Sequence, residues 1–369
     1  MGSRYLVTGG AGFIGRYVCE ALLDRGHQVR VLDSLVEQVH GGASADTLPD
    51  SVEFVHADIR DAGAVRRAIR GVDGVLHLAA EVGVGQSMYE IARYTGANDL
   101  GTAVLLEAMI ENPVERLVVA SSMSVYGEGF YQASDGTVPE VVRRDPGRTR
   151  LGLWDPVAAD GAPLTPMPTA ETKRADLASI YALNKYVQEC SCLIFGAAYS
   201  VDVIALRLFN VFGPGQALSN PYTGVLANFA SRLLHDQSPM IFEDGQQRRD
   251  FVHVRDVARA FCLAMETPAV KGEVINIGSG RSYTIAQVAA LLAAAMKVDR
   301  EPEILGKARS GDIRHCFADI SKATTLLGFQ PEHLLEETIG DIAAWVRQSE
   351  AVDRGLDARR ELEARGLVA

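Results

Sequence analysis

Short apolar runs alternate with amphipathic segments through the first 200 or so residues of the chain. The runs are rich in Val, Ile and Leu and predict strands, whereas the segments between them repeat apolar residues at helical spacing. The predicted strands are Tyr5–Thr8, Val29–Leu32, Val52–Val55, Val75–Leu78, Leu117–Ala120 and Val203–Leu206. The predicted helices include Ile14–Arg25, Ala62–Arg70 and Leu100–Ile110. This alternation predicts an α/β fold with a doubly wound parallel sheet, which binds ligands beyond the carboxyl ends of its strands.

Residues 128–170 interrupt this alternation with a segment rich in Pro, Gly and Asp. A loop of that length inside a compact domain usually has a function of its own. We interpret it as a lid over the substrate or as an oligomer contact. Tyr131 and Trp154 either touch the ligand or fix the loop to the protein, and the second role is the favoured one.

Composition and charge exclude several classes of protein. The net charge of −11 argues against a nucleic-acid-binding protein. The sequence contains no run of 18 or more apolar residues, so we expect no membrane span. The cysteines are scattered without metal-ligand spacing, which predicts reduced thiols and no metal site; they are Cys19, Cys190, Cys192, Cys262 and Cys316. Because the first strand begins almost at the N-terminus, we expect no signal peptide and a cytoplasmic protein.

The stretch "YLVTGGAGFIG" follows a predicted strand and begins a helix. Gly9 allows a tight turn, Gly12 lets the backbone approach a pyrophosphate, and Gly15 lets the helix pack on the strand. Asp33 ends the second strand, 18 residues after Gly15. A carboxylate there accepts hydrogen bonds from a ribose 2′-hydroxyl and repels a 2′-phosphate. The glycine loop and Asp33 together favour a dinucleotide site over the alternative of a simple turn with a capping Asp. Asp33 also favours NAD over NADP as the dinucleotide.

Tyr181 and Lys185 lie four residues apart in "SIYALNKYVQE", a spacing that places both on one helical face. A phenol has a pKa of about 10, and a nearby ammonium group favours its ionised form. An isolated pair of this kind is typical of a helix surface, but here it follows a cofactor loop. We therefore predict Tyr181 as catalytic base and Lys185 as its electrostatic partner. Ser122, which follows a predicted strand, would hydrogen bond the same substrate hydroxyl, whereas Ser124 suits a structural role.

The ordered motifs "TGGAGFIG", "HLAA", "ASSMSVYG", "YALNK", "RLFNVFGPGQ", "RRDFVHVRDV", "NIGSG" and "RSGDIRHCFADISKA" resemble those of extended short-chain dehydrogenases/reductases that act on nucleotide sugars. The resemblance covers roughly residues 4–335. Within this family, "EVGVGQSMYEIARY" and "IFEDGQQRRDFVHV" are similar to dTDP-L-rhamnose 4-epimerases and related dTDP-sugar epimerases. The resemblance implies a Rossmann fold, a smaller C-terminal substrate-binding domain and tightly bound NAD.

The resemblance also implies roles for residues that match the family's motifs. The catalytic residues are Ser122, Tyr181 and Lys185. The cofactor residues are Gly9, Gly12, Phe13, Ile14, Gly15, Asp33, Asp58, Ile59, Leu78, Ala79, Ala80 and Asn98, together with Tyr181 and Lys185. The substrate residues are Val82, Ser122, Ser124, Asn210, Val225, Phe242, Arg249, Arg309, Asp312 and Cys316. Of these, the positions that hold the diphosphate, base and ribose of the nucleotide are matched by Asn210, Val225, Phe242, Arg249, Arg309 and Asp312. Cys316 is equally compatible with a buried core thiol.

The identity of residue 123 argues against dehydration and decarboxylation as the reaction. Related dehydratases place Asp-Glu after the catalytic Ser or Thr, and decarboxylases keep a Glu nearby, but Met123 and Ser124 supply no carboxyl group. We therefore predict an NAD-dependent 4-epimerase for a dTDP-6-deoxyhexose such as dTDP-L-rhamnose, with a transient 4-keto sugar. The alternatives are a UDP-glucose or UDP-N-acetylglucosamine 4-epimerase, a nucleotide 4-keto-sugar reductase, which Asp33 disfavours, and a catalytically silent cofactor-binding protein.

The domain organisation follows from these assignments. We predict a NAD-binding domain over residues 1–209, with 128–170 inserted and 250–278 packing back on it. A smaller nucleotide-sugar domain spans 210–345, and 346–369 form a charged tail. Members of the family commonly form homodimers through the helix near Leu100–Ile110 and the one that carries Tyr181. The apolar residues compatible with such an interface, or with core packing, are Val104, Leu105, Ala108, Val187 and Ile194.

Overall fold

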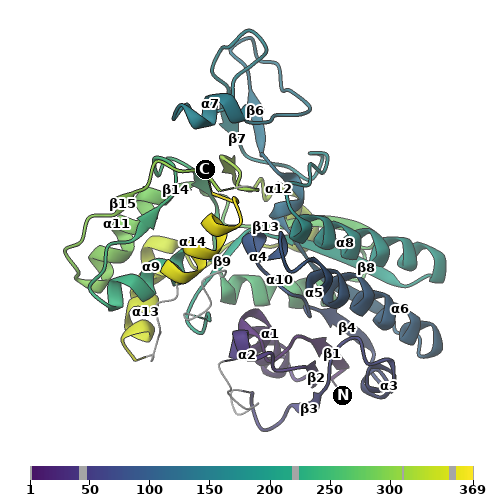
Figure 1. Ribbon diagram of the computed structural model, residues 1–369. Helices are drawn as coiled ribbons and strands as arrows, with labels where there is room; N and C mark the ends of the chain where they lie inside the picture. The colour runs from purple at the N-terminus through teal and green to yellow at the C-terminus, as the bar shows by residue number, and fades with distance from the viewer. Residues whose placement is uncertain (1, 41–47, 218–223, 310, 349–354, 369) are drawn as a thin grey trace.

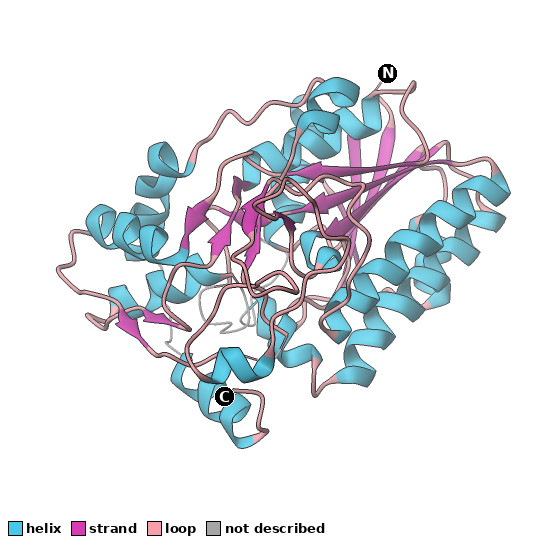
Figure 2. Ribbon diagram, turned by 90° about the horizontal axis from the view of Figure 1, so that it is seen from above, coloured by secondary structure: helices cyan, strands magenta, loops and turns pink. Residues whose placement is uncertain are grey.

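A seven-stranded parallel sheet forms the centre of the larger part of the molecule (Figures 1 and 2). The computed structural model describes residues 2–40, 48–217, 224–309, 311–348 and 355–368. The strand order is β13-β8-β5-β4-β1-β2-β3. The strands are β1 (Arg4–Thr8), β2 (Gln28–Asp33), β3 (Glu53–His56), β4 (Gly74–His77), β5 (Arg116–Ser122), β8 (Asp202–Leu208) and β13 (Glu273–Ile277). The predicted doubly wound α/β fold is confirmed.

Helices cover both faces of this sheet, as Figure 2 shows. One face packs against α1 (Phe13–Asp24), α10 (Val254–Glu266) and α12 (Ser321–Leu327). The other packs against α3 (Ala62–Ala68), α6 (Gly101–Glu111) and α8 (Ile180–Tyr199). Strand order reverses between β1 and β4, so the loops after these strands diverge and leave room for a ligand.

A second hydrophobic core lies outside the sheet. It is formed mainly by three helices, α9 (Val225–Leu234), α11 (Ile285–Met296) and α13 (Leu335–Arg347), which lie on the left in Figure 1. The short strands there are β10 (Met240–Ile241), β11 (Arg248–Arg249), β14 (Tyr283–Thr284), β15 (Glu303–Ile304) and β16 (His315–Cys316). A further pair joins β9 (Asn210–Phe212) to β12 (Phe251–His253). The chain then returns to the large sheet, because β13 pairs with β8 in parallel.

The inserted segment is ordered around a small hairpin. Its elements are β6 (Phe130–Gln132), β7 (Thr165–Met167) and the short α7 (Pro146–Arg150), at the top of Figure 1. Tyr131 is fully buried and donates a hydrogen bond of 2.7 Å to Glu128. Glu128 in turn accepts hydrogen bonds from the backbone amides of Arg314 and His315, and the Tyr131 ring lies 6.0 Å from that of His315. Tyr131 thus packs where the insertion meets the rest of the protein, which agrees with the second of the two roles considered for it. Trp154 is half-buried.

The remaining short elements connect these parts. They are α2 (Glu37–His40), α4 (Val84–Ser87), α5 (Ile91–Thr95), a π-helical turn (Gly96–Leu100) and a 3₁₀ turn (Met123–Tyr126). Near the chain end, α14 spans Gly355–Ala364. Its Leu362 is buried, and the guanidinium of Arg365 beyond it lies 4.1 Å from the ring centre of Tyr89, so this helix and the residue after it pack on the protein. Among the residues described, no helix is long and apolar enough to cross a bilayer.

A buried ion pair fixes α8 to the sheet. Glu189 on α8 accepts hydrogen bonds of 2.5 and 2.9 Å from Arg207 on β8 and one of 2.6 Å from Ser121 on β5. Both charged side chains are less than a tenth exposed. The Arg207 guanidinium also lies 4.7 Å from the centre of the Tyr126 ring. The pair therefore ties α8, which carries Tyr181 and Lys185, to β8 and to β5, which ends at Ser122.

We expect Glu189→Gln to lower the free energy of unfolding by about 3 kcal/mol, because it leaves the buried Arg207 charge without its carboxylate. Urea denaturation followed by circular dichroism measures the change. The matched control is Glu140→Gln, which removes the exposed partner of Arg174 and should cost less than about 0.5 kcal/mol. Equal effects of the two substitutions would contradict a stabilising role for the buried pair.

Candidate active site

A cleft of about 480 Å³ opens at the carboxyl ends of the central strands. Most of the predicted cofactor and catalytic residues line it. These are Gly9, Gly12, Phe13, Ile14, Gly15, Asp33, Asp58, Ile59, Leu78, Ala79, Ala80, Ser122, Tyr181 and Lys185. Segments far apart in the sequence thus meet where the strand order reverses, as a doubly wound sheet predicts.

The glycine loop between β1 and α1 suits a pyrophosphate. Gly9 has φ +71°, and a Cβ on it would lie 2.7 Å from the backbone nitrogen of Ala79. A Cβ on Gly15 would lie 2.3 Å from the carbonyl oxygen of Gly9. Gly12 at the start of α1 provides no side-chain cap, so the first amides of this 12-residue helix face the cleft with a positive dipole end.

Asp33 ends β2 at the rim of the same cleft. Its carboxylate accepts hydrogen bonds from the backbone amides of Ala11 (3.0 Å) and Leu35 (2.9 Å), and His40 lies 3.6 Å from it. Burial raises the pKa of Asp33, but the nearby His40 and the hydrogen bonds from these amides outweigh it and leave the pKa below its ordinary value. Asp33 is therefore an ionised, oriented carboxylate that can accept hydrogen bonds from the hydroxyl groups of a ribose. The sequence pattern did not indicate His40, because its approach depends on the fold of α2.

Asn98, predicted as a cofactor residue, is not among the residues that line the cleft. It supports the lining instead. It is fully buried, its Oδ1 accepts from the backbone amide of Glu81 (2.7 Å), and its Nδ2 donates to the carbonyl of Glu81 (3.1 Å). Asn98 thereby fixes the segment after β4 that lines the cofactor cleft. Glu81 itself lines the cleft and pairs with Arg93 at 2.8 Å, a contact that residue spacing did not reveal.

The three predicted catalytic residues lie together in the cleft. Burial raises the pKa of Tyr181 to about 12, although a hydrogen bond with Ser122 lowers it in part. Burial lowers the pKa of Lys185 to about 8, and its ammonium donates to the carbonyl of Ala120 at 3.0 Å. Burial therefore favours the neutral phenol of Tyr181, and the causes of its pKa shift do not include the charge of Lys185.

Two polar side chains that line the cleft each have a buried oxygen without a hydrogen-bond partner in the described part of the chain. Ser124 Oγ and Asn210 Oδ1 are buried and have no hydrogen-bond partner within the described part of the chain. Both residues line the cleft, as do Val82 and Val225. A buried polar atom costs free energy unless it is paired, so these two atoms suit a ligand with several hydroxyl groups.

The other predicted substrate residues lie elsewhere. Arg309 and Asp312 line a second cavity of about 660 Å³, and Phe242 lies beneath the guanidinium of Arg309 at 4.6 Å. The Arg249 guanidinium donates to the carbonyls of Arg248, Ile313 and Arg314. Cys316 is buried against Met123 and Phe209, in accord with the alternative of a core thiol. The predicted substrate residues are thus divided between two cavities and the core.

Comparison with known proteins places the chain among enzymes. The model of a family described as "NAD dependent epimerase/dehydratase family" matches residues 5–146 and 155–278. The chain belongs to this family. The cofactor of this NAD dependent epimerase/dehydratase is accordingly NAD, and the glycine loop, the α1 amides and Asp33 fit that dinucleotide.

Several family members resemble this one over nearly their whole length. A dTDP-L-rhamnose 4-epimerase from Burkholderia thailandensis is 36% identical over 353 residues, covering 94% of this chain and 96% of the relative. A UDP-glucose 4-epimerase from Thermotoga maritima, solved with UDP-glucose, has a TM-score of 0.77 and 32% identity, covering 94% and 99% of the two chains. The Thermus thermophilus UDP-glucose 4-epimerase, solved with NAD, has a TM-score of 0.75 and 30% identity, with the same coverage.

We expect Asp33→Asn to weaken NAD binding by about ten- to a hundredfold, because hydrogen bonds to a charged acceptor contribute about 1.5–3 kcal/mol. NADP binding should change little or improve, since the repelling charge is gone. Titration of the cofactor-free protein with each dinucleotide by calorimetry measures both affinities. An unchanged ratio of NAD to NADP affinity would show that Asp33 does not choose the cofactor.

Proposed function

We propose that this family member is a nucleotide-sugar 4-epimerase that acts on a dTDP-6-deoxyhexose such as dTDP-L-rhamnose. The observation that carries the proposal is the surroundings of Ser122 and Tyr181. The side chain next to Ser122 is Met123, and the carboxylates that line the cleft within the described residues are Asp33, Asp58 and Glu81. Asp58 pairs with Arg60 and Glu81 with Arg93, so neither is placed as an acid for elimination. The chemistry left to the site is oxidation and reduction at one carbon.

Each catalytic side chain has a defined task. When bound, NAD supplies a hydride acceptor and donor at carbon 4 and a positive ring charge that favours the Tyr181 phenolate. Tyr181 takes the proton of the 4-hydroxyl group, and Ser122 orients that oxygen by hydrogen bonding. The 4-keto sugar rotates in the cleft and presents its opposite face, and Tyr181 then returns the proton to the oxygen on carbon 4. Lys185, whose ammonium donates to the Ala120 carbonyl, would hold the ribose of bound NAD.

Apolar side chains in the cleft support a 6-deoxy substrate. Val82, Val84 and Met123 are among the residues that line it. A methyl group gains by contact with such side chains, whereas a hydroxymethyl or carboxylate group would lose hydrogen bonds to water. The relation to the Burkholderia thailandensis enzyme named dTDP-L-rhamnose 4-epimerase favours the same substrate class.

The decisive experiment incubates the purified protein with dTDP- and UDP-sugars without added cofactor. We expect dTDP-L-rhamnose to be converted to its 4-epimer, observed by chromatography and NMR, with NAD retained through purification. Turnover of UDP-glucose or UDP-N-acetylglucosamine instead would keep the mechanism and change the substrate. Reduction of a 4-keto sugar that needs added NADPH would replace the epimerase by a reductase.

In the same assay, Tyr181→Phe should lower turnover by about a thousandfold, because the proton acceptor is lost. The NAD content measured after denaturation should stay that of the wild type. Tyr186→Phe on the same helix provides the control and should turn over normally. If Tyr181→Phe retained a tenth or more of the activity, roughly, another group would have to serve as base.

We further propose a homodimer formed through α6 and α8. Ile194 is 69% exposed, Leu183 42% and Ile110 46% on these adjacent helices. Of the residues predicted for this surface, Leu105 and Ala108 instead belong to the core, while Val104 and Val187 are half-buried. Exposed apolar side chains on neighbouring helices are typical of a subunit interface.

Ile194→Glu should convert the dimer to a monomer, because a carboxylate would be buried unpaired in the interface. Light scattering coupled to gel filtration measures the mass. Ile304→Glu is the matched control, since Ile304 is also about half exposed but lies on β15. A wild-type protein that is already monomeric at micromolar concentration would rule the interface out.

A further inference from the structure

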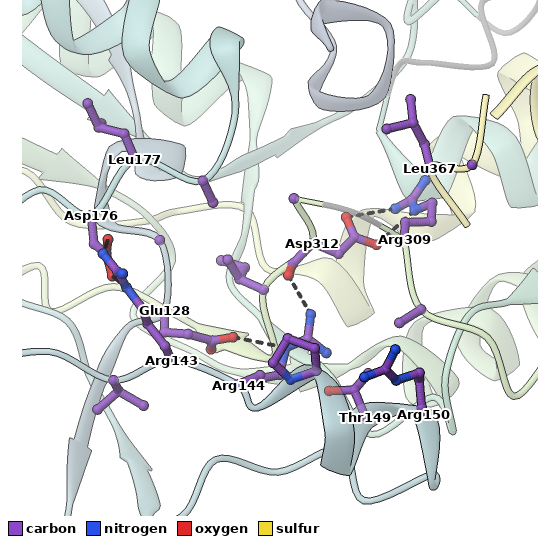
Figure 3. A pocket seen from close by; sticks show the side chains of 18 residues that line it. Glu128, Arg143, Arg144, Thr149, Arg150, Asp176, Leu177, Arg309, Asp312 and Leu367 are labelled. Carbon is purple, nitrogen blue, oxygen red and sulfur yellow. Dashed lines mark hydrogen bonds and ion pairs between the residues drawn. The ribbon is translucent and has the colours of Figure 1, made fainter. Parts of the chain in front are cut away.

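The second cavity contains the predicted nucleotide-binding residues Arg309 and Asp312 (Figure 3). It lies between the insertion, residues 308–309 and 311–313, and the chain end at Gly366 and Leu367. Arg309 Nε and Nη2 donate to Asp312 at 2.7 and 3.2 Å, and its guanidinium covers the ring of Phe242. These three side chains form one unit, built from two segments that are about 70 residues apart in the sequence.

One side chain of the insertion joins the two segments. Arg144 donates to the carboxylate of Glu243, the residue after Phe242, and to the carbonyl oxygen of Asp312. Its Nε also lies 3.3 Å from Glu128, which follows the Met123–Tyr126 turn of the active site. The Arg144 side chain is only 11% exposed. Figure 3 shows it between Glu128 and Asp312.

A planar guanidinium is the group that suits these three acceptors. Arginine offers five N–H donors in a fixed fork, so one side chain can bind several oxygens in set directions. Lysine carries its donors on a single nitrogen at the end of a flexible stem, so it cannot reproduce the separate positions of Nε, Nη1 and Nη2 from which Arg144 reaches the three acceptors. The geometry therefore requires Arg144 itself, rather than any cation, to keep Phe242 and Asp312 in register.

The fold of this region has a separate anchor. Arg314 is almost fully buried and binds Glu243 (3.0 Å), Asp244 (2.6 Å) and Asp155 (2.7 Å). Glu243 therefore keeps a cationic partner when Arg144 is removed, and Asp155 still ties the insertion to Arg314. The contact of Arg144 with the Asp312 carbonyl is the one that this anchor does not replace.

We propose that Arg144 is a positioning residue that sets the nucleotide-binding unit of Phe242, Arg309 and Asp312. The inference rests on the proposed nucleotide-sugar substrate. It gives the insertion a different task from that of a lid over the sugar: it reaches the nucleotide half of the substrate through a fixed guanidinium. The residues that line the cofactor cleft include none from 128–170 within the described residues, which agrees with this task.

The experiment measures binding of dTDP and UDP, without sugar, to the NAD-loaded protein by calorimetry. For Arg144→Met we expect the dissociation constant of the preferred nucleotide to rise about tenfold, the effect of losing about one charge-assisted hydrogen bond. With the sugar nucleotide, KM should rise by a similar factor while kcat changes by less than about twofold. Bound NAD should be unchanged, because the cofactor cleft is separate.

Two further variants make the result specific. Arg144→Lys keeps the charge and length and should weaken nucleotide binding by about threefold or more, since it loses the fork. It also decides the question if Arg144→Met does not fold. Arg174→Met is the matched control: Arg174 pairs with Glu140 on the exposed side of the insertion, outside the cavity lining, and should bind like the wild type.

The outcomes are distinct. Nucleotide affinity of Arg144→Met, or of Arg144→Lys if only that variant folds, within about twofold of the wild type would overturn the inference while leaving the epimerase proposal intact. Parallel loss of NAD, kcat and thermal stability in both variants would also overturn it, because Arg144 would then be a general structural residue. A wild-type protein that binds neither dTDP nor UDP would overturn the proposed function and this inference together.

Discussion

The buried pair between Glu189 and Arg207 is the interaction on which the geometry of the active site depends. Glu189 lies two turns after Tyr181 on α8, and its carboxylate also binds Ser121, the neighbour of Ser122. A buried ion pair contributes less to stability than to geometry, because desolvation offsets most of the attraction. Here it fixes how far α8 slides along β5 and β8. The distance between the Tyr181 phenol and the Ser122 hydroxyl follows from that position, and so does the reach of Lys185 to the Ala120 carbonyl.

Outside this centre, the substrate side is built from loops that ion pairs hold together. Asp155, Glu243, Asp244 and Arg314 connect the insertion to the smaller helical part, and α14 adds a contact of 3.1 Å between Lys307 and Glu363. A loop-built site adapts to its ligand more easily than one built on strands, because its segments are held by few contacts. The division of the substrate residues between two cavities has the same origin: the segments that carry them are set by ion pairs, whereas the cofactor residues are set by the sheet.

This division also explains which features the sequence predicts. The sheet, the glycine loop, Asp33 and the pair Tyr181–Lys185 depend on local periodicity and on short spacings, so they are legible in one chain. The contact of Arg144 with Asp312 spans 168 residues and leaves no local pattern. Arg249 has the chemistry for a diphosphate, yet in the fold its donors are used by main-chain carbonyls, which only the path of the 313–316 segment determines. Asn98 likewise affects the cleft only indirectly, through its hydrogen bond with the backbone of Glu81.

The side chain of Met123 connects this architecture to the choice of reaction. The family description includes both epimerases and dehydratases, so the fold and the NAD site do not distinguish the two. Elimination needs an acid and a base beside the carbons next to carbon 4, and that neighbourhood begins at the residue after Ser122. Met123 is 9% exposed and packs with Val125, Phe209 and Cys316, so this position is part of an apolar wall. Among the described residues that pack around Met123 there is no carboxyl group to expel the hydroxyl next to a ketone at carbon 4, which agrees with the proposed reduction of that ketone from its opposite face.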